Sequence, residues 1–310
     1  MGIVLIFFMR GFMVTFKAFA KINIALDIAG LRDDGYHIVD MIMQDIDLFD
    51  ILSFEKIEDA KGEVIISLIN PDPEGIIPLD DRNLITKAIK RMQKEFDLSD
   101  SVHVTLDKRI PAAAGMAGGS TDCAAAIKAV NELFNLNLSL DEMQNIGVKL
   151  GADVPYCLMG NTARAEGIGE ILTKIAPMPD DIYYLIVKPR AGVSTKETYE
   201  AYDDQKSVEH PDIEKLIKAI ENSDLEEIKN NMGNVLEKVT VNKVPVIADI
   251  EKLMNENNAL ISMMTGSGPT VFGIYKNKED AEKAMQLIHD IITDTDCFVV
   301  GKPIRQEENI

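Results

Sequence analysis

Residues 111–122 read Pro-Ala-Ala-Ala-Gly-Met-Ala-Gly-Gly-Ser-Thr-Asp, and they lie where an apolar helix is expected to begin. Glycine and alanine let the main chain approach a ligand closely, and the first turn of a helix presents unpaired N–H groups and the positive end of its dipole. Such a segment can hold a phosphate group. We therefore predict a nucleotide phosphate loop here, although a glycine-rich helix entry that binds nothing would look the same.

Familiar nucleotide-binding patterns do not describe this segment. A P-loop needs Lys followed by Ser or Thr directly after its last glycine, whereas Gly119 is followed by Ser120 and Thr121. The Rossmann glycine spacing and the protein-kinase signatures are missing from the sequence as well. The loop therefore indicates another class of nucleotide-binding protein.

Length and composition predict a soluble globular enzyme. The chain has 310 residues, of which 46% are hydrophobic and 27% charged, so it is long enough for two domains with cores of their own. The net charge of −19 repels polyanions, so we expect neither nucleic acid nor an anionic membrane as a partner. A local site built from backbone amides, with Lys108 and Arg109 just upstream, could still bind an anion.

Cysteine usage and the N-terminus indicate a cytoplasmic protein. The three cysteines are far apart in the sequence and support neither a disulfide framework nor a zinc site: Cys123, Cys157 and Cys297. The apolar segment Ile3–Met9 is too short to span a bilayer and is interrupted by Arg10 and Gly11. We expect residues 1–13 to form an additional tail.

Hydrophobic periodicity predicts an α+β fold of two domains. In the first domain, residues 1–165, strands come first and helices follow. Its strands are expected at 12–28, 45–54, 63–69 and 101–107, and its helices at 82–96, 121–134 and 140–150. The second domain, residues 166–310, is predicted as a two-layer α/β unit. Its strands are expected at 183–187, 260–264, 270–275 and 297–300, and its helices at 196–202, 213–221, 246–256 and 278–291.

Two charged residues are candidates for chemistry. Lys21 lies in an apolar, strand-like segment, so its ammonium either reaches water on the solvent face of a sheet or is paired in a site; Asn23 shares its face of the strand. Asp153 follows Gly151 in a turn, where an aspartate either caps backbone groups or points into a site. A lysine, a carboxylate and a phosphate loop together suit phosphoryl transfer to an alcohol.

Eight short motifs follow one another along the chain: Ala20-Lys21-Ile22-Asn23, Gly35-Tyr36-His37, Arg82-Asn83-Leu84-Ile85, Lys108 to Asp122, Gly151-Ala152-Asp153-Val154-Pro155, Glu166-Gly167-Ile168-Gly169-Glu170, Gly192-Val193-Ser194-Thr195 and Thr265-Gly266-Ser267-Gly268-Pro269. In this order they resemble the motifs of the 4-diphosphocytidyl-2-C-methyl-D-erythritol kinases, a family within the GHMP kinases. The resemblance runs from about Phe16 to Gly301. It implies the two-domain GHMP-kinase fold, with ATP and Mg²⁺ as cofactors.

The resemblance also implies roles for individual residues. Asp153 would accept the proton of the substrate's C2 hydroxyl, and Lys21 would orient that hydroxyl and stabilise the charge. Ser120 or Thr121 would lie near magnesium. Residues around the ATP phosphates would be Pro111, Ala114, Gly115, Met116, Ala117, Gly118, Gly119, Ser120 and Thr121, with Asn83 and Lys108 close to the adenosine.

Tyr36 and His37 match the family's cytidine pocket. There the histidine would stack on or hydrogen-bond the cytosine, and an aromatic residue of the second domain would cover the other face. The distance from Gly192-Val193-Ser194-Thr195 places Tyr199 in that role, with Tyr202 as its competitor. Asn23 would contact the cytosine or the neighbouring polyol.

The expected function is ATP-dependent phosphorylation of a cytidine diphosphate-linked polyol at its C2 hydroxyl, giving the 2-phosphate for non-mevalonate isoprenoid synthesis. One alternative keeps the fold and changes the acceptor to homoserine, mevalonate or a sugar; Tyr36, His37 and Tyr199 argue against it. A second alternative is a non-catalytic nucleotide-binding protein, which would be expected to have lost Lys21 or Asp153. The enzyme is expected to be a monomer or a homodimer.

Overall fold

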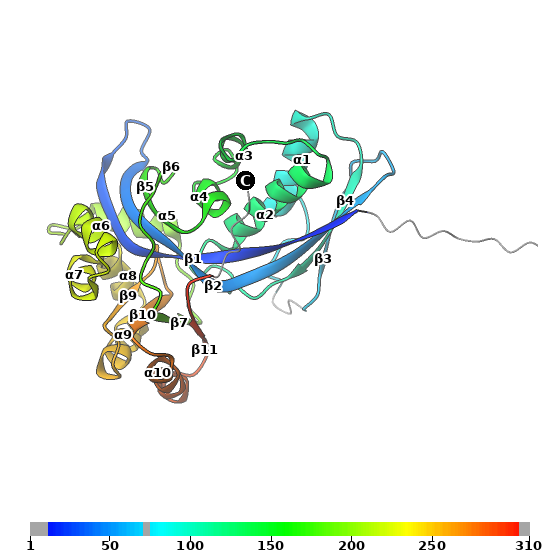
Figure 1. The fold of residues 1–310 in the computed structure, drawn as a ribbon. Helices are drawn as coiled ribbons and strands as arrows, with labels where there is room; N and C mark the ends of the chain where they lie inside the picture. The colour runs from blue at the N-terminus through cyan, green and yellow to red at the C-terminus, as the bar shows by residue number, and fades with distance from the viewer. Residues whose placement is uncertain (1–11, 71–74, 304–310) are drawn as a thin grey trace, which may run out of the picture.

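Two long antiparallel strands, β1 (Met13–Leu31) and β2 (His37–Ile57), run through the molecule and connect its two parts (Figure 1). The structure is a computed structural model and describes residues 12–70 and 75–303. Ile3–Met9 and most of the expected tail therefore lie outside the described residues. Alternation of buried and exposed residues in the first half of β1 is typical of a strand with one face on a core.

The larger sheet has the strand order β3-β4-β2-β1-β8, and β5 and β6 extend it beside β2. The further strands of this sheet are β3 (Val64–Leu68), β4 (Ser101–Asp107), β5 (Thr162–Gly167), β6 (Ile171–Lys174) and the short β8 (Gly233–Asn234). β8 pairs with β1 in parallel at Ala25 and Leu26, so a segment of the second half of the chain completes the sheet.

Four helices cover one face of this sheet (Figure 1). They are α1 (Leu84–Glu95), α2 (Gly118–Leu133), α3 (Leu140–Gly147) and α4 (Val154–Met159). α1 buries Ile85, Ala88, Ile89 and Met92, which recur at helical spacing, against Phe54 and Val104 of the sheet. α2 is rich in alanine, so its backbone can pack closely on β1 and α1.

The second part contains a fully antiparallel sheet of order β11-β7-β10-β9 with helices beside it. Its strands are β7 (Tyr183–Pro189), β9 (Ile261–Met264), β10 (Val271–Tyr275) and β11 (Thr295–Val300). The helices are α5 (Thr195–Asp203), α6 (Ile213–Glu221), α7 (Leu225–Asn231), α8 (Glu237–Lys243), α9 (Val246–Glu256) and α10 (Lys278–Ile291). Of the described helices, none combines the length and the apolar character that crossing a bilayer requires.

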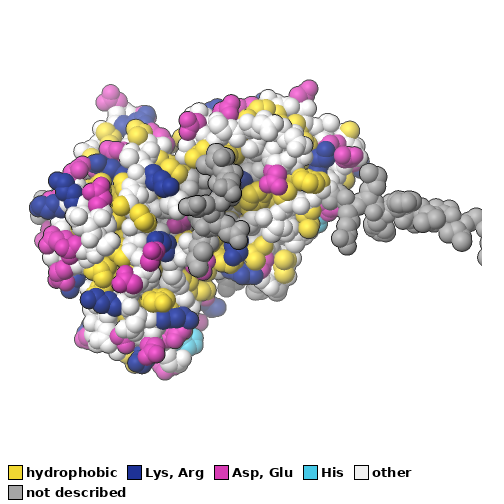
Figure 2. Space-filling view, in the orientation of Figure 1, with side chains coloured by type: hydrophobic (Ala, Val, Ile, Leu, Met, Phe, Trp, Pro, Cys, Tyr) yellow, Lys and Arg dark blue, Asp and Glu magenta, His cyan; other side chains and the backbone are white. Residues whose placement is uncertain are grey.

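A shared hydrophobic core joins the two parts. Ile22 and Ile46 of the long strands pack in one cluster with Ile186 of β7, Phe272 of β10 and Leu216 of α6. On the face seen in Figure 2, acidic and basic side chains are interspersed over both parts. Because the parts share a core, the segment of β1 that lies between them is buried.

The predicted α+β GHMP-kinase fold is confirmed, and most expected elements are present within a few residues. The short elements β5, β6, β8, α7 and α8 were not predicted. Three further differences concern expected segments. β2 begins at His37 instead of Asp45, α2 begins at Gly118 instead of Thr121, and the turn expected around Val154 and Pro155 is the start of α4. Proline is tolerated there because it stands in the first turn of the helix. The domain boundary after residue 165 stays a prediction; strand β5 continues across it, and β6 also pairs in the larger sheet.

Candidate active site

The segment Lys21–Asn23 of β1 lies between two glycine-rich loops. The pairing of β1 with β2 shifts register between Phe19 and Lys21 and again between Asn23 and Ala25. The Lys21 amide donates to the carbonyl of Met116 at 3.2 Å, and the Asn23 amide donates to Thr265 Oγ1 at 2.9 Å. The irregular strand thus bonds to the loop before α2 and to the loop after β9.

Lys21 is buried and paired. It is 5% exposed, which excludes a lysine on the solvent face, and its Nζ donates to Asn23 Oδ1 at 2.7 Å. Asn23 is fully buried, and its Nδ2 donates to the sulfur of Met41 at 3.3 Å. The two polar side chains therefore form a buried pair, as their shared face of the strand indicated.

Asp153 stands immediately before α4, where its side chain makes no capping hydrogen bond. The simple capping role is therefore wrong. The pKa of the Cys157 thiol, one turn further along α4, is affected by this carboxylate. Burial raises the pKa of Cys157, the charge of Asp153 raises it further, and the charge of Lys21 and a hydrogen bond with Thr121 oppose that rise. Lys21 and Asp153 are thus both close enough to Cys157 to affect its pKa, and no ion pair joins Lys21 to Asp153 among the described residues.

The loop before α2 has the backbone of an anion site. Ala113, Gly115 and Ala117 have left-handed φ angles of 50°, 71° and 57°, and Ala117 is the N-cap of α2 without a side-chain cap. The first N–H groups of the helix are thus left without a capping side chain. Gly118 and Gly119 belong to the first turn of α2, where the absence of a side chain at Gly118 makes room for Lys108 and Ile110.

The cations beside this loop are paired with carboxylates. Lys108 Nζ donates to Asp50 at 2.5 Å and to Asp122 at 2.7 Å, and Arg109 binds Asp107. Burial raises the pKa of Asp122 to about 8, against the opposing charge of Lys108. Burial alone would lower the pKa of Lys108, but the two carboxylates hold it above its ordinary value. Both cations next to the loop are thus paired with aspartates in this structure, and their part in binding an anion stays a prediction.

Asn83, expected near the adenosine, has a structural task in this structure. Its Oδ1 accepts from the amide of Ile85 at 2.9 Å and caps α1, and its Nδ2 donates to the carbonyl of Pro78 at 2.7 Å. Both ends of the side-chain amide are engaged. A direct contact between Asn83 and a nucleotide stays a prediction.

The second glycine-rich loop, residues 265–269, packs directly on the first. A Cβ atom on Gly115 would lie 2.9 Å from the carbonyl of Thr265, and one on Gly266 would lie 3.0 Å from the carbonyl of Gly115. Asn234 Nδ2 donates to the carbonyls of Met264 and Gly266 and holds this loop from the side of β8. Residues 265–269 form the turn of the β9–β10 hairpin, and this turn also packs against the loop before α2.

His37 lies at the start of β2 and contacts α5. Its ring centroid is 4.9 Å from that of Tyr199 and 6.3 Å from that of Tyr202, and its Nε2 is 2.7 Å from Asp203 Oδ1. Burial raises the pKa of Tyr199 to about 12, and the charge of Asp153 adds to the effect. Tyr199 thus contacts His37 and lies within electrostatic range of Asp153. Tyr36 is 61% exposed and does not join these ring contacts.

A base does not fit between His37 and Tyr199 in this structure. A ring stacked between two others needs about 3.5 Å on each side, or about 7 Å between the outer rings. The observed centroid distance of 4.9 Å is shorter. The two aromatic residues are brought together as expected, but they contact each other.

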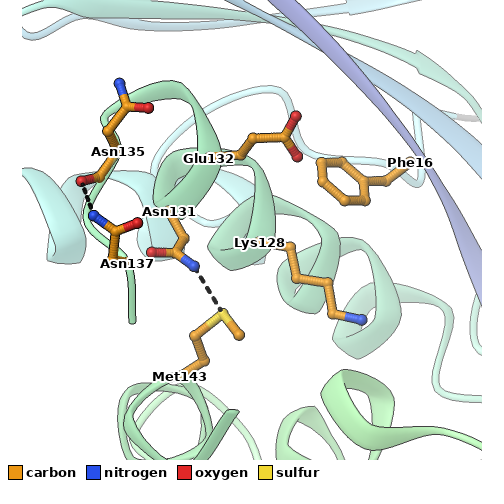
Figure 3. A pocket seen from close by; sticks show the side chains of 7 residues that line it. All are labelled: Phe16, Lys128, Asn131, Glu132, Asn135, Asn137 and Met143. Carbon is orange, nitrogen blue, oxygen red and sulfur yellow. Dashed lines mark hydrogen bonds between the residues drawn. The ribbon is translucent and has the colours of Figure 1, made fainter. Parts of the chain in front are cut away.

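Two further features bear on ligands. Within residues 12–70 and 75–303, no group of three or more His, Cys, Asp or Glu side chains is arranged to hold a metal ion. A surface hollow of about 410 Å³ lies between β1 and the C-terminal half of α2 (Figure 3), lined by Phe16, Lys128, Asn131, Glu132, Asn135, Asn137 and Met143. It contains none of the candidate site residues.

Several residues of the site were not predicted from the sequence. Thr265 was known only as part of a motif, and its bond to Asn23 spans 242 positions. Asp50 and Asp203 had no signal, because isolated aspartates in strands and helices are common. The sequence around Cys157 carried no signal either, because its hydrogen bond with Thr121 and its interaction with Asp153 depend on the fold.

Comparison with known proteins agrees with this geometry. Residues 83–161 match the model of the GHMP kinases N terminal domain, and residues 216–286 match that of the GHMP kinases C terminal. The chain is 47% identical over 278 residues to a 4-diphosphocytidyl-2-C-methyl-D-erythritol kinase of Clostridium botulinum strain Alaska E43, covering 90% of this chain and 96% of that protein. The enzyme of the same name from Caldicellulosiruptor bescii is 47% identical over 285 residues, covering 91% and 97%.

Solved structures agree on the fold. A crystal structure of 4-(cytidine 5'-diphospho)-2C-methyl-D-erythritol kinase matches with a TM-score of 0.75 at 24% identity, covering 94% of this chain and all of that one. A homoserine kinase from Cytophaga hutchinsonii matches with a TM-score of 0.76 at 19% identity, covering 97% and 98%. Backbone similarity therefore does not distinguish between kinases with different acceptors, whereas the two sequence relatives carry the same enzyme name. By its sequence and fold, the chain belongs to the 4-diphosphocytidyl-2-C-methyl-D-erythritol kinase family of the GHMP kinases.

Proposed function

We propose that the protein transfers the γ-phosphoryl group of ATP to the C2 hydroxyl of 4-diphosphocytidyl-2-C-methyl-D-erythritol and releases the 2-phosphate and ADP. The observation that carries this proposal is the convergence of three elements. The Lys21 amide bonds to the carbonyl of Met116 in the phosphate loop, and the turn that carries Asp153 lies against the start of α2, where a Cβ on Gly151 would be 3.9 Å from Ser120 Oγ. The segments that carry a cation and a carboxylate thus both adjoin the phosphate loop, in a chain whose relatives carry the name of this enzyme.

The chemistry follows from these positions. Asp153 takes the proton of the C2 hydroxyl, the hydroxyl oxygen forms a bond to the γ-phosphorus, and the bond from that phosphorus to the β,γ-bridging oxygen breaks to leave ADP. Lys21 stabilises the negative charge that develops on the attacking oxygen. Asn23 holds the Lys21 ammonium through the hydrogen bond at 2.7 Å and so limits its freedom.

The nucleotide binds at the start of α2 in this proposal. The left-handed residues of the loop and the uncapped N–H groups of α2 suit the phosphates of ATP, and Asn83 and Lys108 belong to the same side of the site. Thr121 is 3% exposed and its side chain bonds to Cys157, whereas Ser120 is more accessible. We therefore favour the Ser120 hydroxyl as a ligand for Mg²⁺, which would neutralise phosphate charge.

The cytidine end of the substrate binds beside His37 and Tyr199. Because these rings are in contact, a base either separates them by about 2 Å or stacks on the outer face of one of them. The exposed ring of Tyr36 lies next to His37 in the chain and is free to cover such a base.

The experiment is an assay of ADP formation with Mg²⁺ and 4-diphosphocytidyl-2-C-methyl-D-erythritol, with homoserine and mevalonate as control acceptors. We expect turnover with the cytidine diphosphate-linked alcohol alone. Asp153→Asn should lower kcat by a factor of about 100 or more and leave the affinity for ATP unchanged. Asp181→Asn, which changes an exposed aspartate, is the matched control and should be fully active. Turnover of homoserine or mevalonate instead would refute the assigned acceptor.

A further inference from the structure

Lys108 is held in a buried cluster with two aspartates below the phosphate loop. Its Nζ donates to Asp50 Oδ2 at 2.5 Å and to Asp122 Oδ2 at 2.7 Å. The exposed fractions of the three side chains are 14% for Lys108, 0% for Asp50 and 6% for Asp122. Burying three ionisable groups is unfavourable unless they are arranged to satisfy one another, so this cluster holds its geometry firmly.

The cluster connects three elements that surround the loop. Asp50 belongs to β2, Lys108 stands just before the loop, and Asp122 lies in the second turn of α2. Asp50 Oδ1 also accepts from the amides of Arg109 at 2.6 Å and Ile110 at 2.8 Å. One carboxylate thus fixes both the side chain of Lys108 and the main chain that enters the loop.

The ammonium of Lys108 lies against the first turn of α2. A Cβ atom on Gly118 would be 3.1 Å from Lys108 Nζ. Two carboxylates share this single ammonium, so the cluster offers no net positive charge to a phosphate. Attraction for phosphates in the loop must come mainly from the N–H groups of α2, whose position the cluster determines.

We propose that Asp50, Lys108 and Asp122 are positioning residues that set the backbone of the phosphate loop, and that Lys108 acts on a bound nucleotide through this loop instead of through the adenosine. This inference rests on one part of the proposed function, namely that a nucleoside triphosphate binds at the loop. It assigns a task to Asp50 and Asp122, which are too deeply buried to contact a ligand.

The two modes of action differ in what they predict for ligands without adenosine. A contact between Lys108 and adenosine would strengthen the binding of ATP but leave inorganic triphosphate unaffected. A cluster that positions the loop would affect ATP and inorganic triphosphate equally. The affinities of both ligands, measured by titration calorimetry with Mg²⁺ and without an acceptor, therefore separate the two modes.

The variants for this test are Asp50→Asn, Lys108→Met and the double variant, with Lys17→Met as the matched control. Lys17 is an exposed lysine on β1 that lies over the ring of Phe49. We expect each single variant to weaken both ligands by the same factor, about ten-fold, because a charged hydrogen bond that orders the loop is lost. The double variant should be no weaker than Lys108→Met, since the residues act as one unit. Lys17→Met should bind both ligands normally.

Three outcomes would overturn the inference. Lys108→Met could weaken ATP and leave inorganic triphosphate unchanged, which would show contact with adenosine. Asp50→Asn could leave both affinities unchanged, which would show that the cluster does not position the loop. If circular dichroism shows that Lys108→Met does not fold, Asp50→Asn alone decides the test. The wild-type protein could bind neither ligand, which would refute the proposed function as well as this inference. Because the wild type is measured first, this outcome is distinguished from the other two before any variant is compared.

Discussion

Gly115 and Gly266 face each other across the two parts of the molecule. The carbonyl oxygen of Thr265 occupies the space that a side chain on Gly115 would need, and the carbonyl oxygen of Gly115 does the same for Gly266. Both have left-handed φ angles, 71° and 58°. A Cβ on either residue would lie within 3.0 Å of a backbone oxygen of the other loop. The phosphate loop is therefore supported by the second half of the chain.

Gly266→Ala is expected to displace the phosphate loop. The new methyl group meets the carbonyl of Gly115, and the left-handed backbone adds a cost of about 1–2 kcal/mol. We expect a lower free energy of unfolding and weaker ATP binding, measured by urea unfolding and calorimetry. Gly301→Ala, where the Cβ has no atom within 4 Å and φ is not left-handed, is the control. Equal behaviour of the two variants would contradict the interlock.

Thr265→Val should destabilise the fold, whereas Thr270→Val should not. Both threonines are fully buried, but Thr265 Oγ1 accepts the amide of Asn23, while Thr270 Oγ1 has no hydrogen-bond partner. Losing the acceptor leaves a buried N–H unsatisfied, at a cost of about 1–3 kcal/mol. Urea unfolding of the two variants measures this difference. A loss of stability in Thr270→Val as large as that in Thr265→Val would argue against the role of the Asn23 bond.

Asp203→Asn should affect the substrate and spare the nucleotide. The Asp203 carboxylate bonds to His37 but is exposed, so its contribution to stability is at most about 1 kcal/mol. Because it orients the His37 ring, we expect a higher KM for the cytidine diphosphate-linked alcohol and unchanged kcat and ATP KM. Asp204→Asn changes the neighbouring exposed carboxylate and should be silent. An altered ATP KM in Asp203→Asn would point to a general distortion.

Stability should decrease between pH 5 and pH 8, in part through Glu251. Burial raises the pKa of Glu251 to about 8, and the neighbouring carboxyl of Glu237 contributes; Glu237 itself has a raised pKa through burial. The folded state therefore keeps a proton that the unfolded state releases near pH 4.5, so the stabilisation present at low pH is lost as the pH rises towards 8.

Glu251→Gln tests this pH dependence. The amide cannot release a proton, so the slope of the free energy of unfolding against pH should fall by up to about 1.4 kcal/mol per pH unit. Asp122, whose pKa is also about 8, keeps its own share of the slope in both proteins. Urea unfolding at several pH values between 5 and 8 provides the measurement. Parallel curves for the variant and the wild type would contradict a titration of Glu251 in this range.

Local patterns were enough to find most of the fold. α6, α9, α10 and β4 coincide with the ranges expected from periodicity. β5 and β6 were missed because they lack a clear apolar alternation: β5 contains Arg164, Glu166 and Gly167, and no residue of β6 is buried. β5 pairs with β2, a neighbour more than 100 positions away, and β6 joins the sheet only through β5, so local propensity does not describe either pairing.

The sequence was enough to single out the loop at residues 111–122, the shared strand face of Lys21 and Asn23, and the family. These depend on residue type and short spacing, which a chain carries without folding. That Lys21 is buried and bonded to Asn23 emerged only from the fold. Only the tertiary structure decided which charges neutralise one another and which loops touch. Lys108 is neutralised by Asp50, and Gly115 meets Gly266, because β2 and the second half of the chain fold back onto the loop. Burial and long-range contact determine how such groups act, and neither is a property of a segment alone.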